Sequence, residues 1–169
     1  MFQQMVKYSL IFLLIFTCSV YALSTDKEKV MHVMADSADL NQHDHKGIYT
    51  GNVELIQGTT NLHATKAVTL GNEKNQLVLA IASGSNGKQA HYWTLTDSKK
   101  ASFHAYADTI RYYPLRHLIE LIGNARVEQG NDSFSAAKIS YDTITQHVLS
   151  QGNGKKRITI VYHPEKKAS

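Results

Sequence analysis

An internal repeat, which begins near His32 and again near His104, is the strongest constraint on the fold of this 169-residue chain. Ten residues between positions 31 and 70 recur later in the chain at one constant spacing, the number of positions that separates His32 from His104. Composition alone would give roughly two or three such matches. This spacing is called the repeat offset below. A repeat that cannot bury its own apolar face has to stack against the next copy. The sequence therefore predicts two similar stacked halves, as in a solenoid or a jellyroll. The matching pairs are His32/His104, Ala35/Ala107, Asp36/Asp108, His45/His117, Gly51/Gly123, Asn52/Asn124, Gln57/Gln129, Gly58/Gly130, Ala64/Ala136 and Lys66/Lys138.

Alternation of apolar and polar residues runs through both halves, and no helical periodicity accompanies it. Examples are Val53-Glu54-Leu55, Leu62-His63-Ala64, the run from Tyr106 to Tyr112, and Ile158-Thr159-Ile160. β-Branched and aromatic residues are frequent in these runs, and Gly-Asn, Gln-Gly and Asn-Gly pairs separate them. The pattern predicts an all-β fold of two similar halves, each built from short antiparallel strands at intervals of about ten residues.

The residues that recur most clearly favour structural roles. Gly51-Asn52 and Gln57-Gly58, with their counterparts in the second half, are predicted to form turns, because Gly and Asn tolerate positive φ. Asp36 and Asp108 each follow a predicted strand, where a carboxylate can accept hydrogen bonds from backbone N–H groups of a turn. We therefore assign both aspartates to the scaffold and not to catalysis.

The segment from Met1 to Ala22 resembles a cleavable secretory signal. Lys7 supplies the positive charge, Leu10 to Phe16 is an unbroken apolar run, and Val20-Tyr21-Ala22 offers small residues at the cleavage site. Cleavage would remove Cys18, the one cysteine, so that a core and not disulfides must stabilise the exported chain. The predicted organisation is a signal at 1–22, one domain at 23–164 and a flexible basic tail at 165–169. An uncleaved membrane anchor is the alternative.

Several functional classes find little support in the sequence. An exported chain is an improbable nucleic-acid binder despite a net charge of +4, and Lys155-Lys156-Arg157 suits a solvated turn or an anionic lipid headgroup. The stretch from Ser83 to Gly87 lacks the spacing of a nucleophile elbow, and no phosphate-binding glycine loop occurs. His43 and His45 lie in a polar stretch without further metal ligands nearby. We expect no enzyme activity, no cofactor and no metal site.

The alternation predicts which side chains share one apolar face. In the run after Gly51, Val53 and Leu55 face one way and Glu54 faces the other. Residue type alone favours an interior that packs only against itself, although an open-ended β-sandwich with such an interior can also hold acyl chains. The predicted interior, and candidate lipid-binding, residues are Met31, Val33, Val53, Leu55, Leu62, Tyr92, Ile110, Tyr112, Val127, Phe134 and Tyr141.

A set of ordered motifs resembles the OstA-like family of periplasmic lipopolysaccharide transport proteins, the LptA family. The resemblance covers about residues 29–164, most of the predicted mature chain. The motifs are His32-x-x-Ala35-Asp36, Tyr49-Thr50-Gly51-Asn52-Val53-x-x-x-Gln57-Gly58-Thr59, Ala64-x-Lys66, Gly123-Asn124-Ala125-x-Val127-x-Gln129 and Gly154-Lys155-Lys156-Arg157-Ile158-Thr159.

This resemblance implies an open-ended, twisted β-jellyroll in the periplasm whose V-shaped interior carries the acyl chains of lipopolysaccharide. It places lipid contacts at Met31, Tyr92 and Tyr112, whereas Pro114 departs from the longer apolar residue of relatives. It also implies head-to-tail association through edge strands near 31–35 and 158–162. The implied partners are lipopolysaccharide, an LptC-like inner-membrane protein, the N-terminal domain of an LptD-like outer-membrane protein and further copies of the chain.

Two alternatives to a soluble lipid carrier remain open at this point. An LptC-like relative has the same fold and keeps a membrane anchor, which is expected if the segment before Leu23 is not cleaved. A β-scaffold protein without lipid cargo is the other alternative, and it predicts a tightly packed interior that lipid does not stabilise.

Overall fold

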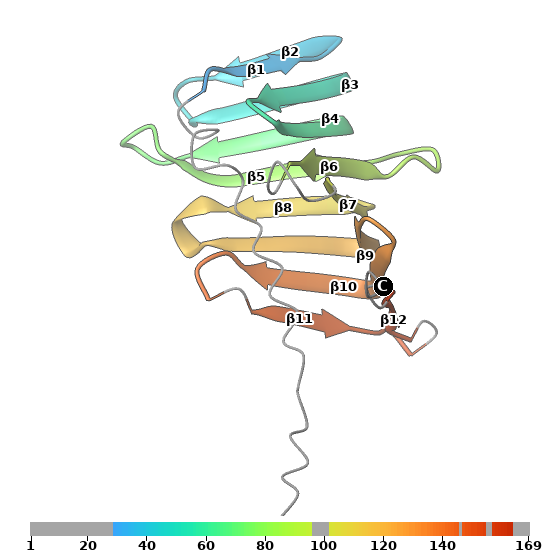
Figure 1. Ribbon diagram of the computed structural model, residues 1–169. Coiled ribbons are helices and arrows are strands. Elements are labelled where there is room, and N and C mark those ends of the chain that lie inside the picture. Colours follow the sequence, from blue (N-terminus) through green and yellow to red (C-terminus); the bar gives the residue numbers. More distant parts are fainter. Residues whose placement is uncertain (1–28, 96–101, 146, 155–156, 164–169) are drawn as a thin grey trace, which may run out of the picture.

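The computed structural model describes residues 29–95, 102–145, 147–154 and 157–163 (Figure 1). The predicted signal at 1–22, Lys155, Lys156 and the predicted tail at 165–169 lie outside these ranges. Within them the chain is built almost entirely of β-strands, and no helix is long and apolar enough to cross a membrane.

Twelve strands and one short 3₁₀ helix follow one another along the described chain. The first half holds β1 (Met31–Met34), β2 (Ser37–Asn41), β3 (Lys46–Gln57), β4 (Thr60–Gly71), β5 (Leu77–Ser83) and β6 (Ala90–Thr94). The second half holds β7 (Phe103–Ala107), β8 (Thr109–Tyr113), η2 (Pro114–Arg116), β9 (Leu118–Gln129), β10 (Asp132–Asp142), β11 (Val148–Gln151) and β12 (Thr159–Val161).

The strands form two layers that share four long strands, β3, β4, β9 and β10. One half of each long strand belongs to the first layer, together with β1, β6, β7 and β12. The other half belongs to the second layer, together with β2, β5, β8 and β11. All pairings are antiparallel, and the strands stack from β1 and β2 at one end to β11 and β12 at the other (Figure 1).

The repeat inferred from the sequence is a repeat of structure. The register of β1 on β3, with Met31 opposite Gln57, recurs at the repeat offset on β7 and β9, with Phe103 opposite Gln129. β2 on β3 and β8 on β9 match in the same way. β6 pairs with β7, and β5 pairs with β8, so that the two halves join in both layers.

The Gly-Asn pairs are bulges inside long strands, so their prediction as turns was wrong. Gly51 and Asn52 have φ of 78° and 43°, and Gly123 and Asn124 have 79° and 47°. At Gly51-Asn52 the pairing with β4 skips, and β3 passes from the second layer to the first. A bulge bends a strand without ending it, so β3 and β9 continue past their Gly-Asn pairs, and β4 and β10 pair along their whole length. The Gln-Gly pairs are hairpin turns as predicted, with φ of 60° at Gly58.

An aspartate fixes each bulge from the neighbouring chain segment. The backbone N–H of Asp108 donates to the carbonyl of Gly123 at 2.9 Å, and Asn124 Nδ2 donates to Asp108 Oδ2 at 2.9 Å. Asp36 makes the equivalent bonds in the first half. The structural role of both aspartates is confirmed, but their carboxylates bind an asparagine amide and not the backbone of a turn. Asp108 also divides the run from Tyr106 to Tyr112, predicted as one strand, into β7 and β8.

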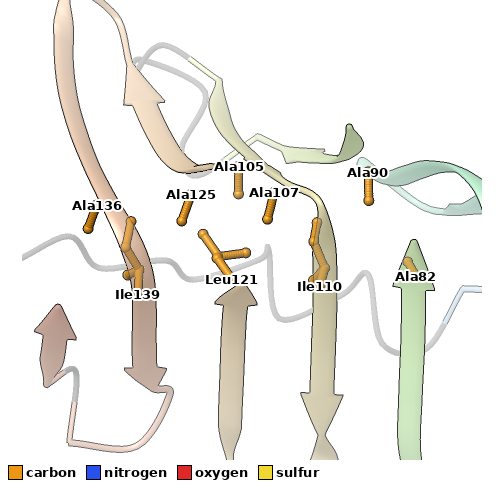
Figure 2. Close-up of a cluster of buried hydrophobic side chains, with 9 residues drawn as sticks. All are labelled: Ala82, Ala90, Ala105, Ala107, Ile110, Leu121, Ala125, Ala136 and Ile139. Carbon is orange, nitrogen blue, oxygen red and sulfur yellow. The ribbon is translucent and has the colours of Figure 1, made fainter. Parts of the chain in front are cut away.

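Alanines dominate the core where the two layers meet (Figure 2). Ala105, Ala107 and Ala125 of the first layer and Ala82 of the second are at most 4% exposed. Short side chains let two sheets approach closely, and larger side chains beside them hold the sheets apart. The buried cluster comprises Ala82, Ala90, Ala105, Ala107, Ile110, Leu121, Ala125, Ala136 and Ile139.

Candidate functional site

The inner face of the first layer carries an apolar row across all of its strands. Val33 lies opposite Leu55, Leu55 opposite Leu62, and Leu62 opposite Tyr92. Because cross-strand neighbours share one face of a sheet, the row reaches from the edge strand β1 to the edge strand β12. Its further members are Ala105, Val127, Phe134 and Ile160.

The inner face of the second layer carries a matching row. Tyr112 lies opposite Ala80 on one side and Ile119 on the other, and Ile119 lies opposite Tyr141. This row also reaches both edges, at Val148 on β11 and, through Thr69 and Gly47, at Leu40 on β2. Both layers thus carry apolar side chains on their inner faces, and the alanine-rich core lies where the layers meet.

The structure places all eleven predicted site residues on the inner faces of the two layers. Val53 and Ile110, at 1% and 7% exposed, belong to the close-packed interior. Met31, Val33 and Tyr112 are exposed, at 49%, 40% and 37%. The other predicted residues, which are Leu55, Leu62, Tyr92, Val127, Phe134 and Tyr141, are half-buried. The site therefore grades from a closed interior to open apolar surface, and ligand contact at these residues stays a prediction.

The sequence prediction missed several inner-face residues, among them Phe103 and Ile119. Phe103 and Ile119 are half-buried and pack against the core cluster. Phe103 occupies the position of Met31 in the second half, so the repeat offset could have identified it. Ile119 corresponds to Gly47 of the first half, and the repeat therefore gave no signal for it.

Tyr112 places a phenol on the inner face of the second layer. Burial of part of the side chain raises the pKa of its phenol above the ordinary value. The hydroxyl is therefore uncharged at neutral pH and can donate a hydrogen bond. Tyr112 offers an apolar ring and one neutral donor to whatever lies between the layers.

A hollow of about 660 Å³ lies at the β2 end of the second layer. Leu40, Gly47 and Tyr49 of the inner face line it, together with His45. The histidine-rich loop from Asn41 to Lys46 thus borders the inner face, and the His45 ring is held by Asn75 Oδ1 at 3.0 Å from its Nδ1. Among the described residues, no group of three or more His, Cys, Asp or Glu could hold a metal ion.

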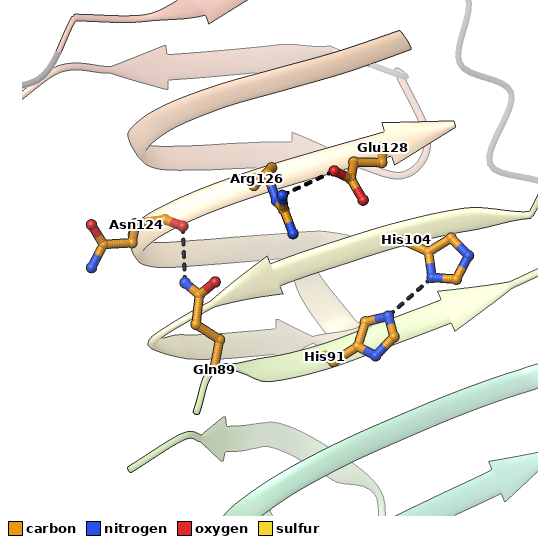
Figure 3. Close-up of polar contacts among 6 residues, drawn as sticks. All are labelled: Gln89, His91, His104, Asn124, Arg126 and Glu128. Atoms are coloured by element: carbon orange, nitrogen blue, oxygen red, sulfur yellow. Dashed lines mark hydrogen bonds and ion pairs between the residues drawn. The ribbon is translucent and has the colours of Figure 1, made fainter. Parts of the chain in front are cut away.

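The outer face of the first layer is polar and aromatic (Figure 3). The His91 ring stacks on Tyr106 at 4.2 Å between centroids, and His91 Nε2 lies 3.0 Å from His104 Nδ1. Arg126 lies over Tyr106 and pairs with Glu128 at 3.1 Å. Burial, and then the neighbouring charges led by His104, lower the pKa of His91 to about 4. These side chains satisfy one another, which distinguishes the outer face from the inner one.

The edge strands expose apolar side chains at both ends of the stack. Met31, Val33 and Met34 are exposed on β1, and Leu40 is exposed on β2. At the other end β11 and β12 expose Val148, Leu149, Ile160 and Val161. An edge strand of this kind presents backbone donors and acceptors to which a further strand can be added.

Comparison with known protein families identifies the family to which this chain belongs. The family model described as LptA/(LptD N-terminal domain) LPS transport protein matches residues 32–147. The chain belongs to this family. The matched segment begins in β1 and ends just before β11, so that it includes most of both halves of the repeat. The resemblance seen in the sequence motifs is confirmed.

Individual relatives of the LPS transport family agree with this assignment. The chain is 34% identical over 155 residues to the lipopolysaccharide export system protein LptH of Pseudomonas aeruginosa, which covers 87% of this chain and 86% of LptH. It is 27% identical over 146 residues to LptA of Escherichia coli K12, which covers 85% and 76% of the two chains. The crystal structure of LptH from P. aeruginosa matches with a TM-score of 0.71 and 28% identity, over 83% of this chain and 99% of that one. The predicted all-β, jellyroll-like fold is confirmed.

Proposed function

We propose that this protein is a periplasmic carrier of lipopolysaccharide, and that its two inner faces hold the acyl chains of the lipid A part. One observation carries the proposal. The apolar row of the first layer runs unbroken from β1 to β12, the row of the second layer is interrupted only at Gly47 and Thr69, and both rows are partly exposed. The membership of the chain in an LPS transport family supports lipopolysaccharide as the ligand.

Acyl chains suit this site because their burial is not directional. Each methylene removed from water contributes about 0.8 kcal/mol, so several chains supply ample binding energy without specific hydrogen bonds. A protein whose interior packs only against itself leaves no large inner side chain exposed. Here Val33 and Tyr112 are 40% and 37% exposed on the inner faces. These exposures favour a lipid carrier over a scaffold without cargo.

The route and the partners follow from the same features. We propose that residues 1–22 direct export and are cleaved, which places the mature chain in the periplasm. The edge strands β1 and β2 would join one neighbour, and β11 and β12 another. We propose an LptC-like protein, further copies of this chain and the N-terminal domain of an LptD-like protein as these neighbours, which together would bridge the two membranes.

The proposal predicts that binding depends on the acyl chains. We expect the purified protein to bind lipid A and intact lipopolysaccharide, and to bind the fully deacylated saccharide at least about a hundredfold more weakly, since the apolar contact is then lost. Isothermal titration calorimetry with the three ligands measures this, with detergent below its critical micelle concentration. Equal affinity for deacylated and acylated ligands would show that the protein recognises the saccharide and not the chains.

A further inference from the structure

We propose that Arg157 of one copy binds the Asp36 carboxylate of the next copy, and that this ion pair fixes the register of the junction between β12 and β1. The inference rests on the proposed joining of edge strands. It goes further by naming the contact that selects one register and one polarity. The occupant of the edge is a second copy of this chain.

The junction between the two halves of the molecule provides a template for a junction between two copies. There β6 pairs with β7 in the first layer, with Tyr92 opposite Ala105, and β5 pairs with β8 in the second, with Ala82 opposite Ile110. Through their pairing with β10 and β4, β12 and β11 correspond to β6 and β5. At the repeat offset, β1 and β2 correspond to β7 and β8. The two free ends of the stack therefore have the same design as the two surfaces that already meet inside it.

Polar contacts hold the internal junction where the chain crosses between layers (Figure 3). Gln89 Nε2 donates to the carbonyl of Asn124 at 3.0 Å, and it also lies 3.4 Å from Asp108 Oδ1. The N–H of Gly84 donates to the carbonyl of Asp108 at 2.9 Å. A side chain of the first half thus reaches the aspartate and the bulge of the second half, beside the paired strands.

Arg157 occupies the position of Gln89 at the open end. Gln89 lies two residues before His91, and His91 pairs with His63. Arg157 likewise lies two residues before Thr159, and Thr159 pairs with Ser135. Ser135 is the counterpart of His63 at the repeat offset. The spacing from Ser83 to His91 is also equal to that from Gln151 to Thr159. The equivalence therefore follows from strand register on one side and from loop length on the other.

The receiving end is equally well matched. Asp36 and Asn52 stand where Asp108 and Asn124 stand, and they make the same amide-to-carboxylate bond, at 3.0 Å. Ionised carboxylates have room for about four hydrogen bonds, so the Asp36 carboxylate can accept a guanidinium as well as the Asn52 amide. Both Arg157 and Asp36 are exposed. The copied register brings Ile160 opposite Val33 of the next copy, and Val161 opposite its His32.

Arginine at the open end, in the place of the internal glutamine, makes the proposed contact with the aspartate an ion pair instead of a hydrogen bond from a neutral amide. A charge-assisted hydrogen bond is roughly twice as strong as a neutral one. A cation at one end of the stack and an anion at the other also disfavour the pairing of two like ends, because like charges would then meet. The permanent internal junction needs no such selection, because the chain itself holds its two halves together. A junction between separate copies gains both affinity and polarity from the pair.

A cysteine cross-link reads out the register. Ile160→Cys and Val33→Cys, combined with Cys18→Ser, are expected to form disulfide-linked chains, because directly opposite strand residues lie within disulfide range. Val161→Cys with Val33→Cys is the matched control, since the two thiols then face opposite sides of the sheet. We expect at least tenfold less cross-linking from the control pair. Absence of association and of cross-linking in both pairs would overturn the joining of edge strands itself.

Variants of Arg157 then test the ion pair separately. By sedimentation of the protein without added cysteines, Arg157→Glu is expected to weaken self-association at least about tenfold, and Arg157→Gln about threefold with a smaller dependence on salt. Arg157→Lys keeps the charge and should stay within about threefold of wild type. Lys88→Glu, on the exposed loop between β5 and β6 in the middle of the stack, makes the same change in net charge and should leave association unchanged. Unaltered association of Arg157→Glu, with the Ile160–Val33 cross-link retained, would overturn the ion pair and leave edge joining in place.

Discussion

Replacing Leu55 by aspartate is expected to weaken the binding of lipopolysaccharide at least about a hundredfold. Leu55 lies in the apolar row of the first layer, between Val33 and Leu62, and it is half-buried on the inner face. An acyl chain against this row would have to bury an unpaired carboxylate, which costs several kcal/mol. A hundredfold loss corresponds to about 2.7 kcal/mol and is therefore a lower estimate.

The adjacent residue provides the matched control for this experiment. Ile56 has a side chain of the same size as that of Leu55 and is also half-buried, but it lies on the opposite face of β3. Ile56→Asp should bind lipopolysaccharide within about threefold of wild type, because its carboxylate points to solvent. Thermal unfolding of both variants shows that they are folded, and Leu55→Asn serves if Leu55→Asp is not. Equal loss of affinity in the two aspartate variants would contradict an inner-face site.

Gly123→Ala is expected to destabilise the protein by about 3 kcal/mol or more. Gly123 has φ of +79°, which costs an L-residue about 1–2 kcal/mol. A methyl group there would also overlap the Asp108 carboxylate. The carboxylate would have to move away from the amide of Asn124, and the loss of a hydrogen bond to a charged group costs about 1.5–3 kcal/mol.

Gly87→Ala separates the two causes of this loss. Gly87 has φ of +76°, and no atom lies within 4 Å of an added methyl group. We expect Gly87→Ala to cost only the backbone term, about 1 kcal/mol. Urea unfolding of both variants, followed by far-UV circular dichroism, gives the two free energies of unfolding. Equal losses at Gly87 and Gly123 would mean that the aspartate does not constrain the bulge.

Much of the fold could be predicted because the repeat and the alternation are both visible in the sequence without any knowledge of pairing. The repeat offset established the equivalence of Asp36 with Asp108 and of the segments that form β3 and β9. The period of two predicted that Val53 and Leu55 share one face of the sheet and that Glu54 lies on the other. The structure places the three residues in this way. Residues of the candidate site thus share a face because side chains two positions apart in a strand point to the same side of the sheet.

The remaining features depend on long-range pairing, which a single sequence does not display. A Gly-Asn pair has the same φ preference in a turn and in a bulge, and only the pairing of β3 with β4 distinguishes the two. The joining of β5 to β8 and of β6 to β7 likewise brings together segments with no local signal for each other. Ala105, Ala107 and Ala125 carry no distinctive signal in the sequence, yet they determine how closely the two layers approach.

Photo-cross-linking in living cells tests the inner-face lipid path most directly. A benzophenone amino acid at Tyr112 is expected to form an adduct with lipopolysaccharide, because this side chain lies on the inner face and is 37% exposed. The same amino acid at Tyr113, on the opposite face of β8 beside Arg116, is the control and should give none. An adduct at Tyr112 alone is the result the account predicts. Adducts of equal yield at both positions, or none at Tyr112 in a folded and exported variant, would contradict it.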